Sequence, residues 1–495
     1  MQVNPLNNIK SDTFTLELPL RVSPAQEKQL LVRLDCARQL YNTCLCEALR
    51  RLKLMRQSKA WRRARLMKKS KVKTEEFRNL DKFFGFREYD LHSFAVTIKN
   101  SSHIGDHLDV HVCQKIATRA FKVTQEYLFS KRGKPRFKGW NQLISVEGKS
   151  NANGIRFRGD QIIWSGLELP IMFDKKDKHG VQGHALGCRT KYVRIVTRKL
   201  SGKKRFYAQL IQEGKPKEKH AVGVGIVGLS LAPSSIAAVS SADALLESFC
   251  EDLLPINKEI LRIKRRLGRS LKAFNPDGFT KKGRLKPGYT LKRSKAYLRD
   301  LERLYDLNRR LSASRKSLHG RMANRVLAMG NTINLEKLSH KAWQRIFGKS
   351  VKFRAPREFV SLLRRKAERA GGVVNEFSVR TNLFSSKCHN CGEVRKELLS
   401  QRWHSCVCGI HAQRDLYSAF LATLVVGNDL DIRQAQKAWT GAEPLLRHAV
   451  SRYDQTVIGK VHFASFDLNR SLNSSYGEER STQDEAEDSE AHFDG

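Results

Sequence analysis

The sequence predicts an α+β protein of several domains, and three observations lead to this fold class. Helical spacing follows Ser23 as far as Leu45, short alternating strands occupy residues 141–214, and a second apolar β pattern begins at Ala221. With 495 residues, of which 40% are hydrophobic, the chain has room for about three domains of about 150 residues, each with a buried core.

The first part of the chain predicts one strand and then helices. Residues 13–21, TFTLELPLR, alternate apolar and polar side chains as a strand does. Ser23, Pro24 and Gln26 form a capping-box pattern with proline at the first helical position, which predicts a helix start. Apolar residues then recur at helical spacing as far as Leu45, and more helix is expected through residues 116–128.

Residues 141–214 predict an antiparallel β-barrel or sandwich. The segments LISVEG, GIRFRG, QIIWSG, KYVRIV and RFYAQLIQEG are short, alternate in polarity and are separated by Gly/Asn turns. Arg and Lys rim these segments, as expected of a sheet that faces nucleic acid.

The second half predicts a mixture of strands and helices. Its long basic helices are expected at 254–271 and 291–318, a strand at 332–338, and further helices at 356–370 and 414–426. The segment GVGIVG at 223–228 matches a dinucleotide-binding glycine pattern. That fold needs a helix to open there, whereas Pro233 and β-forming residues follow, so we reject it.

The charge of the chain favours a nucleic-acid partner. The net charge is +43, and residues 50–73 hold twelve Lys/Arg and no acid. A single basic run is usually a solvated helix face, but here the excess extends along almost the whole chain. An acidic segment, residues 477–495, is expected to be disordered. The candidate nucleic-acid contacts are Arg50, Arg51, Arg62, Arg63, Arg65, Lys68, Lys69, Arg136 and Lys138.

The apolar and cysteine patterns favour a reduced cytoplasmic protein. No run of about 18 apolar residues predicts a membrane span, and the first residues lack an apolar signal region. Six of the ten cysteines are scattered, which argues against a disulfide framework.

The other four cysteines predict a structural zinc site. Cys388 and Cys391 have C-x-x-C spacing, and Cys406 and Cys408 follow as the tighter pair C-x-C. Four thiolates suit a closed tetrahedral zinc site, in which the ion links two parts of a small loop-rich ribbon and stabilises its fold. His389, His404 or His411 could replace one thiolate, and four free thiols remain the alternative.

Two carboxylates are candidates for a magnesium site. Glu336 lies near the end of the strand INLEKL, and Asp415 opens the helix RDLYSAF. Phosphodiester cleavage by two metal ions needs several acids that converge on the ions. Either residue alone has an ordinary explanation, since an acid suits the first turn of a helix and a glutamate is common on a surface.

The order of these motifs resembles the RuvC-like core of TnpB, a family of RNA-guided nucleases, and of the compact type V CRISPR effectors. The matching segments are VGLSLAPSSIAAV, INLEKLS, SSKCHNCG with CVCG, and AQRDLYSAFLA, and GKPRFKGW at 133–140 looks like a family segment. The resemblance implies a bilobed architecture: a helical recognition lobe with a β-barrel wedge domain, then an RNase H-like domain with inserted helices and a zinc ribbon.

The resemblance also implies domain boundaries. The first strand of the wedge barrel is expected at 1–22, the helical recognition domain at 23–132 and the rest of the wedge barrel at 133–218. The RuvC-like domain is expected at 219–384, with a helical insertion at 254–318, and is followed by the zinc ribbon at 385–410 and the third RuvC motif at 411–430. A C-terminal segment at 431–476 and an acidic tail at 477–495 follow.

The family's metal-binding positions carry over to Ser230, Glu336 and Asp415. The last two match, but the first should be aspartate, and no Asp or Glu occurs from residue 219 to 242. Ala232 also departs from the usual glycine. A neutral hydroxyl is a poor magnesium ligand, so Mg²⁺ is expected to bind weakly and the chain is expected not to be an active nuclease.

The leading hypothesis is therefore an RNA-guided protein of the prokaryotic nucleoid that binds double-stranded DNA beside a short adjacent motif. It would act by occupancy, in antiviral defence or gene silencing, or by recruiting a partner protein. The first alternative is a feeble RNA-guided nuclease. The second is a guide-independent zinc-ribbon protein that binds nucleic acid.

Overall fold

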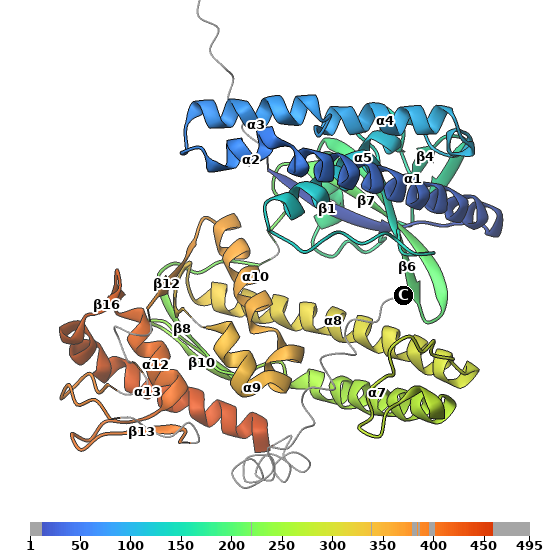
Figure 1. The fold of residues 1–495 in the computed structure, drawn as a ribbon. Helices are drawn as coiled ribbons and strands as arrows, with labels where there is room; N and C mark the ends of the chain where they lie inside the picture. The colour runs from blue at the N-terminus through green and yellow to red at the C-terminus, as the bar shows by residue number, and fades with distance from the viewer. Residues whose placement is uncertain are drawn as a thin grey trace, which may run out of the picture. The chain divides into compact units, whose positions relative to one another are not determined.

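The structure, a computed structural model, describes residues 12–218, 220–337, 339–378, 384, 387–395 and 401–458 (Figure 1). The chain forms two compact units that divide at residues 219 and 220. The acidic segment 477–495 and the last part of the segment 431–476 lie outside the described residues. In the part that is described, no helix has the length and apolar character needed to cross a membrane.

The first unit is built on helix α1, Pro24–Gln57, which starts at the predicted capping box. The Ser23 hydroxyl accepts a hydrogen bond from the Gln26 N–H at 3.3 Å, and the Ser23 N–H donates to the Gln26 side chain at 2.9 Å. The buried stripe of α1 packs against α4 and α5. The other helices of this part are α2 Lys59–Leu66, α3 Lys71–Phe83, α4 Glu88–Asn100, η1 His103–Asp106 and α5 Val110–Leu128.

Two antiparallel sheets complete the first unit and share one hydrophobic core with α1 and α5. One sheet has the order β1-β7-β6-β2, and the other has the order β3-β4-β5. The elements are β1 Thr13–Pro19, β2 Ser145–Glu147, β3 Arg156–Arg158, β4 Gln161–Trp164, β5 Leu167–Pro170, α6 Val181–Gly187, β6 Thr190–Leu200 and β7 Lys203–Glu213. Strand β5 and helix α6 were not among the predicted segments.

The expected barrel is not found among the described residues. A single bridge between Leu20 and Ile171 joins the two sheets, and β2 at the far edge is only three residues long. Closing a barrel requires a continuous ladder around the whole ring of strands, which these short edges do not provide. The layers are therefore two open sheets that pack on a common core.

The second unit contains one mixed sheet with the order β10-β9-β8-β11-β12. Strands β8, β9 and β10 pair antiparallel, whereas β8, β11 and β12 run parallel. Their bounds are β8 Ile226–Leu231, β9 Ser235–Val239, β10 Ala244–Ser248, β11 Thr332–Glu336 and β12 Val373–Phe377. The strand predicted at 332–338 thus ends at Glu336.

Helices cover both faces of this sheet. One face packs on α7, α8 and α10 through side chains such as Leu229 and Leu335, and the other packs on α12 and α13 through Ala237 and Val239. The helices are α7 Leu254–Phe274, α8 Lys295–Met329, α9 His340–Arg354, α10 Pro356–Arg369, α12 Arg414–Thr423 and α13 Ile432–Ile458, with the short turns η2 Glu251–Leu253 and η3 Pro276–Gly278. Neither α9 nor α13 was predicted.

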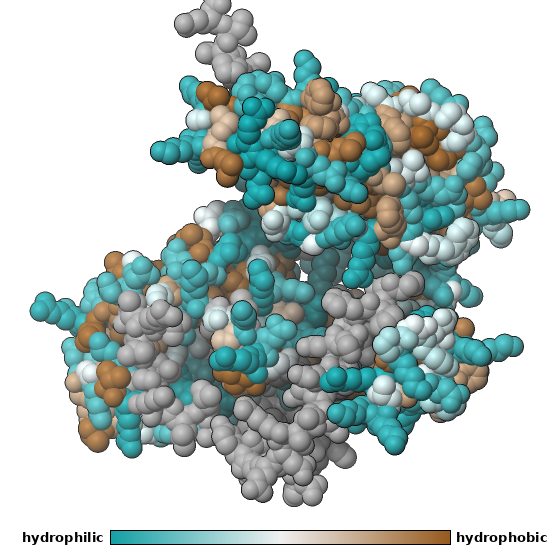
Figure 2. Space-filling model, viewed as in Figure 1, coloured by the Kyte–Doolittle hydropathy of each residue, from teal (hydrophilic) through white to brown (hydrophobic). Residues whose placement is uncertain are grey.

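Among the described residues visible in Figure 2, hydrophilic side chains predominate, and hydrophobic ones form small separate patches. This distribution agrees with the large cationic excess of the chain.

Helix α12 lies directly on strand β8 at Gly228. A Cβ atom on Gly228 would lie 1.9 Å from the Ala419 carbonyl oxygen and 2.7 Å from the Thr423 nitrogen. Real Cβ atoms do not approach backbone this closely, so only glycine fits between strand and helix. This close approach positions the first turn of α12 over the end of β8.

The first prediction concerns this contact. Gly228→Ala should lower the free energy of unfolding by about 3 kcal/mol or more, because strand and helix must separate to admit the methyl group. The control is Gly268→Ala in α7, where an added Cβ has no neighbour within 4 Å. This control should be neutral or stabilising by up to about 1 kcal/mol. Urea unfolding of both variants measures the difference, and equal stability would contradict the packing argument.

Candidate functional site

Two of the three predicted metal-binding positions lie side by side at one end of the mixed sheet. Strands β8 and β11 run parallel with Leu229 beside Leu335, so the next pair along is Ser230 and Glu336. Leu229 and Leu335 point into the core on the α8 side, so Ser230 and Glu336 face α12 by strand alternation. Both side chains are half-buried.

The third position, Asp415, lies in the first turn of α12 and is buried. Its Oδ2 atom accepts a hydrogen bond of 2.7 Å from the Ser235 hydroxyl. Ser235 begins β9, on the same face as Ala237, which pairs with Ser230. The fold therefore brings Ser230, Glu336 and Asp415 to the same end and the same face of the sheet.

A second partner of Asp415 comes from the cysteine-rich segment. The Arg402 guanidinium lies 4.0 Å from Asp415 Oδ2, and the Arg402 carbonyl accepts a hydrogen bond from the Arg414 N–H at 2.9 Å. Sequence reasoning did not single out Ser235 or Arg402. No local pattern marks them, because their role depends on contacts across 180 and 13 positions of the chain respectively.

Glu336 is placed in an environment that favours its neutral form. Burial raises the pKa of Glu336 to about 7, from an ordinary value of 4.5. A raised carboxyl pKa is typical of functional sites, where a bound cation restores the charged form. The site thus combines one desolvated carboxyl, one hydrogen-bonded aspartate and one serine.

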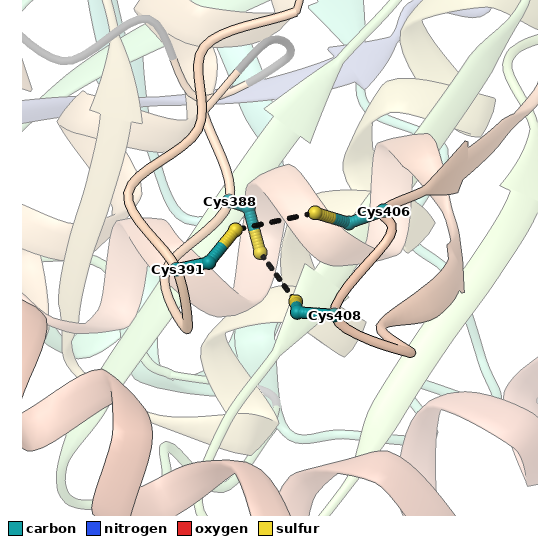
Figure 3. A group of neighbouring side chains, drawn as sticks. All are labelled: Cys388, Cys391, Cys406 and Cys408. Atoms are coloured by element: carbon teal, nitrogen blue, oxygen red, sulfur yellow. Dashed lines mark hydrogen bonds between the residues drawn. The ribbon is translucent and has the colours of Figure 1, made fainter.

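The four cysteines converge on one point (Figure 3). The Sγ atoms of Cys388 and Cys408 are 3.5 Å apart, those of Cys391 and Cys406 are 3.3 Å apart, and all four lie within 4.8 Å of one another. Tetrahedral zinc with Zn–S bonds of about 2.3 Å would separate its sulfur atoms by about 3.8 Å. The cluster therefore fits a zinc ion with four thiolate ligands.

Two similar turns present these thiols. Gly392 donates its N–H to the Cys388 carbonyl at 3.0 Å, and Gly409 donates to the Cys406 carbonyl at 3.0 Å. Both glycines adopt positive φ, +76° and +91°, which lets each turn close immediately after its second cysteine. The C-x-C pair is therefore as tightly folded as the C-x-x-C pair.

The three histidines considered as substitute ligands lie outside the sulfur cluster. His389 is buried and hydrogen-bonds through Nδ1 to the Tyr417 hydroxyl at 2.8 Å, and burial lowers its pKa to about 4. The ring of His404 stacks on that of Tyr417 at 4.5 Å between centroids. His411 interacts with Ser405 at 2.8 Å and stacks on Trp403. Among the described residues, the group that could hold a zinc ion is thus the four cysteines alone.

Tyr417 connects the ribbon to helix α12. Its hydroxyl accepts a hydrogen bond from the His389 N–H at 2.9 Å, and the His404 ring lies parallel to its own within 9°. Since Tyr417 is two residues beyond Asp415, both cysteine turns help to hold the helix that carries this carboxylate.

The basic residues that the sequence predicts as nucleic-acid contacts differ in their exposure and in their protein partners. Arg50 and Arg51 both bind the Glu47 carboxylate at 2.7 Å, and Arg51 also donates to the Gly85 carbonyl at 2.6 Å. These two arginines therefore stabilise the helices of the first unit. The exposed members of the set are Arg50, Arg62, Arg63, Arg65, Lys68, Lys69 and Arg136, whereas Arg51 and Lys138 are half-buried.

A hollow of about 880 Å³ adjoins the basic segment on α2. Its lining includes Arg56, Arg62 and Arg65 together with Trp61. Several guanidinium groups around an aromatic ring suit phosphate and base contacts.

Comparison with known families supports the resemblance stated above. Residues 357–421 match the family described as Cas12f1-like, TNB domain. The matched segment contains α10 except for its first residue, all four cysteines and Asp415. No curated protein matches the chain.

Solved structures of similar proteins include two complexes. One is described as the Cas12f1-sgRNA-target DNA complex, with 14% identity and a TM-score of 0.40, covering 83% of this chain and 98% of that chain. The other is described as a CRISPR-Cas12f ternary complex, with 12% identity and a TM-score of 0.29, covering 82% of this chain and 83% of that chain.

The second prediction concerns Glu336. Between pH 4.5 and 7 the native state keeps its proton while the unfolded state loses it, so wild-type stability falls relative to Glu336→Gln as the pH rises. In magnesium-free buffer at pH 8 the variant should be more stable by about 2 kcal/mol, allowing for partial exposure. Unfolding curves at pH 5 and pH 8 measure this. The exposed Glu76, changed to Gln, is the control and should show no such difference.

The third prediction concerns the cysteine cluster. Wild type should carry about one zinc ion per chain, and Cys391→Ser should lose it, because three thiolates and a hydroxyl hold zinc far less well than four thiolates. Elemental analysis after dialysis measures the zinc content. Cys46→Ser, which removes an exposed thiol of α1, is the matched control and should keep its zinc. Wild-type protein without zinc would contradict the assignment.

Proposed function

We propose that this chain is an RNA-guided effector that binds double-stranded DNA at sequences read by its guide, and that it lacks nuclease activity. Its output is occupancy of the target, which blocks transcription or replication, or recruitment of another protein. The structural zinc holds the ribbon together. Guide RNA and target DNA beside a short adjacent motif are its partners.

The observation that carries this proposal is the serine at position 230. It occupies the carboxyl end of β8 beside Glu336, on the face where Asp415 also lies. A two-metal phosphodiesterase needs negatively charged ligands that bridge and hold both ions. With a neutral hydroxyl at position 230, the site has one negatively charged ligand fewer. Each 1.4 kcal/mol of transition-state stabilisation that is lost lowers the rate of cleavage about tenfold.

The surroundings of Asp415 support the same conclusion. Ser235 donates a hydrogen bond to it, and the Arg402 guanidinium lies near the same oxygen. Protein groups thus compensate the carboxylate charge, so a magnesium ion has less to gain by displacing them. With Glu336 favouring its neutral form, the site has little net negative charge to attract two divalent ions.

The nucleic-acid part of the proposal rests on charge and on the family match. A net charge of +43 over the whole chain suits a partner that is itself a polyanion. The motifs in the second unit and the Cas12f1-like match at 357–421 favour a guide RNA over a guide-independent mode.

The fourth prediction tests binding and cleavage in one sample. The protein is purified with co-expressed RNA, the RNA is sequenced, and matching labelled duplex DNA is added with magnesium. We expect one defined RNA species with a constant segment, and a guide-dependent shift of intact DNA. Cleaved DNA would show that Glu336 and Asp415 suffice for catalysis. A heterogeneous RNA mixture would favour a general nucleic-acid-binding protein.

A substitution at residue 230 tests directly whether the serine accounts for the missing cleavage. Ser230→Asp should raise magnesium-dependent cleavage by at least about a hundredfold, which corresponds to about 3 kcal/mol of restored transition-state stabilisation. Adding Glu336→Ala to this variant should abolish the gain while leaving DNA binding unchanged. If Ser230→Asp binds its target but does not cut, residue 230 is not the missing ligand.

A further inference from the structure

Two large aromatic side chains lie in solvent on the loop of residues 134–140, KPRFKGW, which we call the aromatic loop. Phe137 is 54% exposed and Trp140 is 71% exposed. Rings of this size normally bury most of their surface, and exposed aromatics are enriched at binding sites. Two of them within four positions of one loop therefore mark a candidate binding surface.

The aromatic loop is firmly anchored to the first unit. The Asn42 side chain, on α1, donates to the Lys138 carbonyl at 2.9 Å and accepts from the Lys138 N–H at 2.8 Å. The Gly139 N–H donates to the Gln142 side chain at 2.9 Å, and Pro135 is buried. The rings are thus presented from a backbone that is already ordered, which reduces the entropy lost on binding.

The surroundings of the two rings are strongly cationic. The Arg38 guanidinium lies 5.8 Å from the centre of the Trp140 ring, and Lys134 and Arg136 are exposed on the same loop. The sequence contains no Asp or Glu from residue 127 to 146. Asp35 is the acid that contacts this group of cations, through its ion pair with Arg38 at 2.7 Å.

We propose that Phe137 and Trp140 form a stacking platform for unpaired bases of single-stranded nucleic acid, while Lys134 and Arg136 contact the flanking phosphates. Stacked bases in a duplex cover one another's faces, so a protein ring can stack only on an unpaired or terminal base. The cationic surroundings favour this ligand over an apolar protein partner. The inference rests on the proposed function, because it assumes a nucleic-acid partner.

The test measures the binding of the full chain, freed of co-purified RNA, to labelled single strands of about 20 nucleotides, the length of a guide segment. RNA and DNA strands of mixed sequence are used, together with the corresponding DNA duplex. Trp140→Ala should weaken single-strand binding by about 5- to 100-fold and change duplex binding by less than about twofold. The RNA and DNA arms show which strand occupies the platform.

Conservative variants separate stacking from mere apolar contact. Trp140→Phe should retain most of the affinity because it keeps an aromatic face, whereas Trp140→Leu should bind as weakly as Trp140→Ala. Phe83→Ala is the control, since Phe83 is an aromatic residue of the same unit that is 83% exposed and lies on α3. It should bind like wild type.

The salt dependence provides an independent readout. Trp140→Ala should shift the affinity equally at every salt concentration, since stacking releases no counterions. Arg136→Ala should instead reduce the slope of log affinity against log salt by about one.

The proposal is wrong if wild type binds single strands and both Trp140→Ala and Phe137→Ala bind equally well. It is also wrong if Trp140→Leu binds like wild type, which would point to a protein that docks on an apolar patch. If wild type binds neither single strands nor duplex, the proposed function itself fails, and the platform fails with it.

Discussion

Helix α12 approaches strand β8 so closely at Gly228 that no side chain fits between them, and the position of Asp415 follows from that approach. The helix carries Asp415 one turn before Ala419, the residue whose carbonyl faces Gly228, so the carboxylate lies over the end of the strand. On the other side of α12, the cysteine turns hold Tyr417 through hydrogen bonds and ring stacking. A glycine and a cysteine cluster far apart in sequence thus fix one carboxylate together.

The same end of the sheet brings a serine and two acids together within a folded core. Asp415 is hydrogen-bonded to Ser235, and burial shifts Glu336 toward its neutral form. The hydrogen bond from Ser235 offsets part of the cost of burying Asp415, whereas the neutral form lowers the cost of burying Glu336. The proposed loss of cleavage through Ser230 would therefore leave the scaffold intact, as an effector that acts by occupancy requires.

In the first unit, some basic side chains are held by other protein groups, whereas others are exposed to solvent. Arg51 is held by Glu47 and the Gly85 carbonyl and supports helix packing, although it belongs to the densest basic run. Arg136 is exposed on an anchored loop beside two exposed rings, where we propose that it contacts a phosphate. The basic run in the sequence predicts a nucleic-acid contact at Arg51, but the partners of Arg51 indicate a structural role. The aromatic neighbours of Arg136 indicate a binding surface only because the structure shows that they are exposed.

The sequence by itself determined the local features: the capping box at Ser23, the strands at Thr13–Pro19 and Thr332–Glu336, the helix at Pro356–Arg369, and the cysteine spacing. Each depends on residues within a few positions of one another, so hydrophobic period and capping chemistry suffice to predict it. The tertiary structure alone decided that the β-rich segment forms two open sheets, that histidines lie outside the sulfur cluster, and that Ser235 and Arg402 reach Asp415. These outcomes depend on strand closure, burial and contacts between distant segments, for which the sequence carries no local signal.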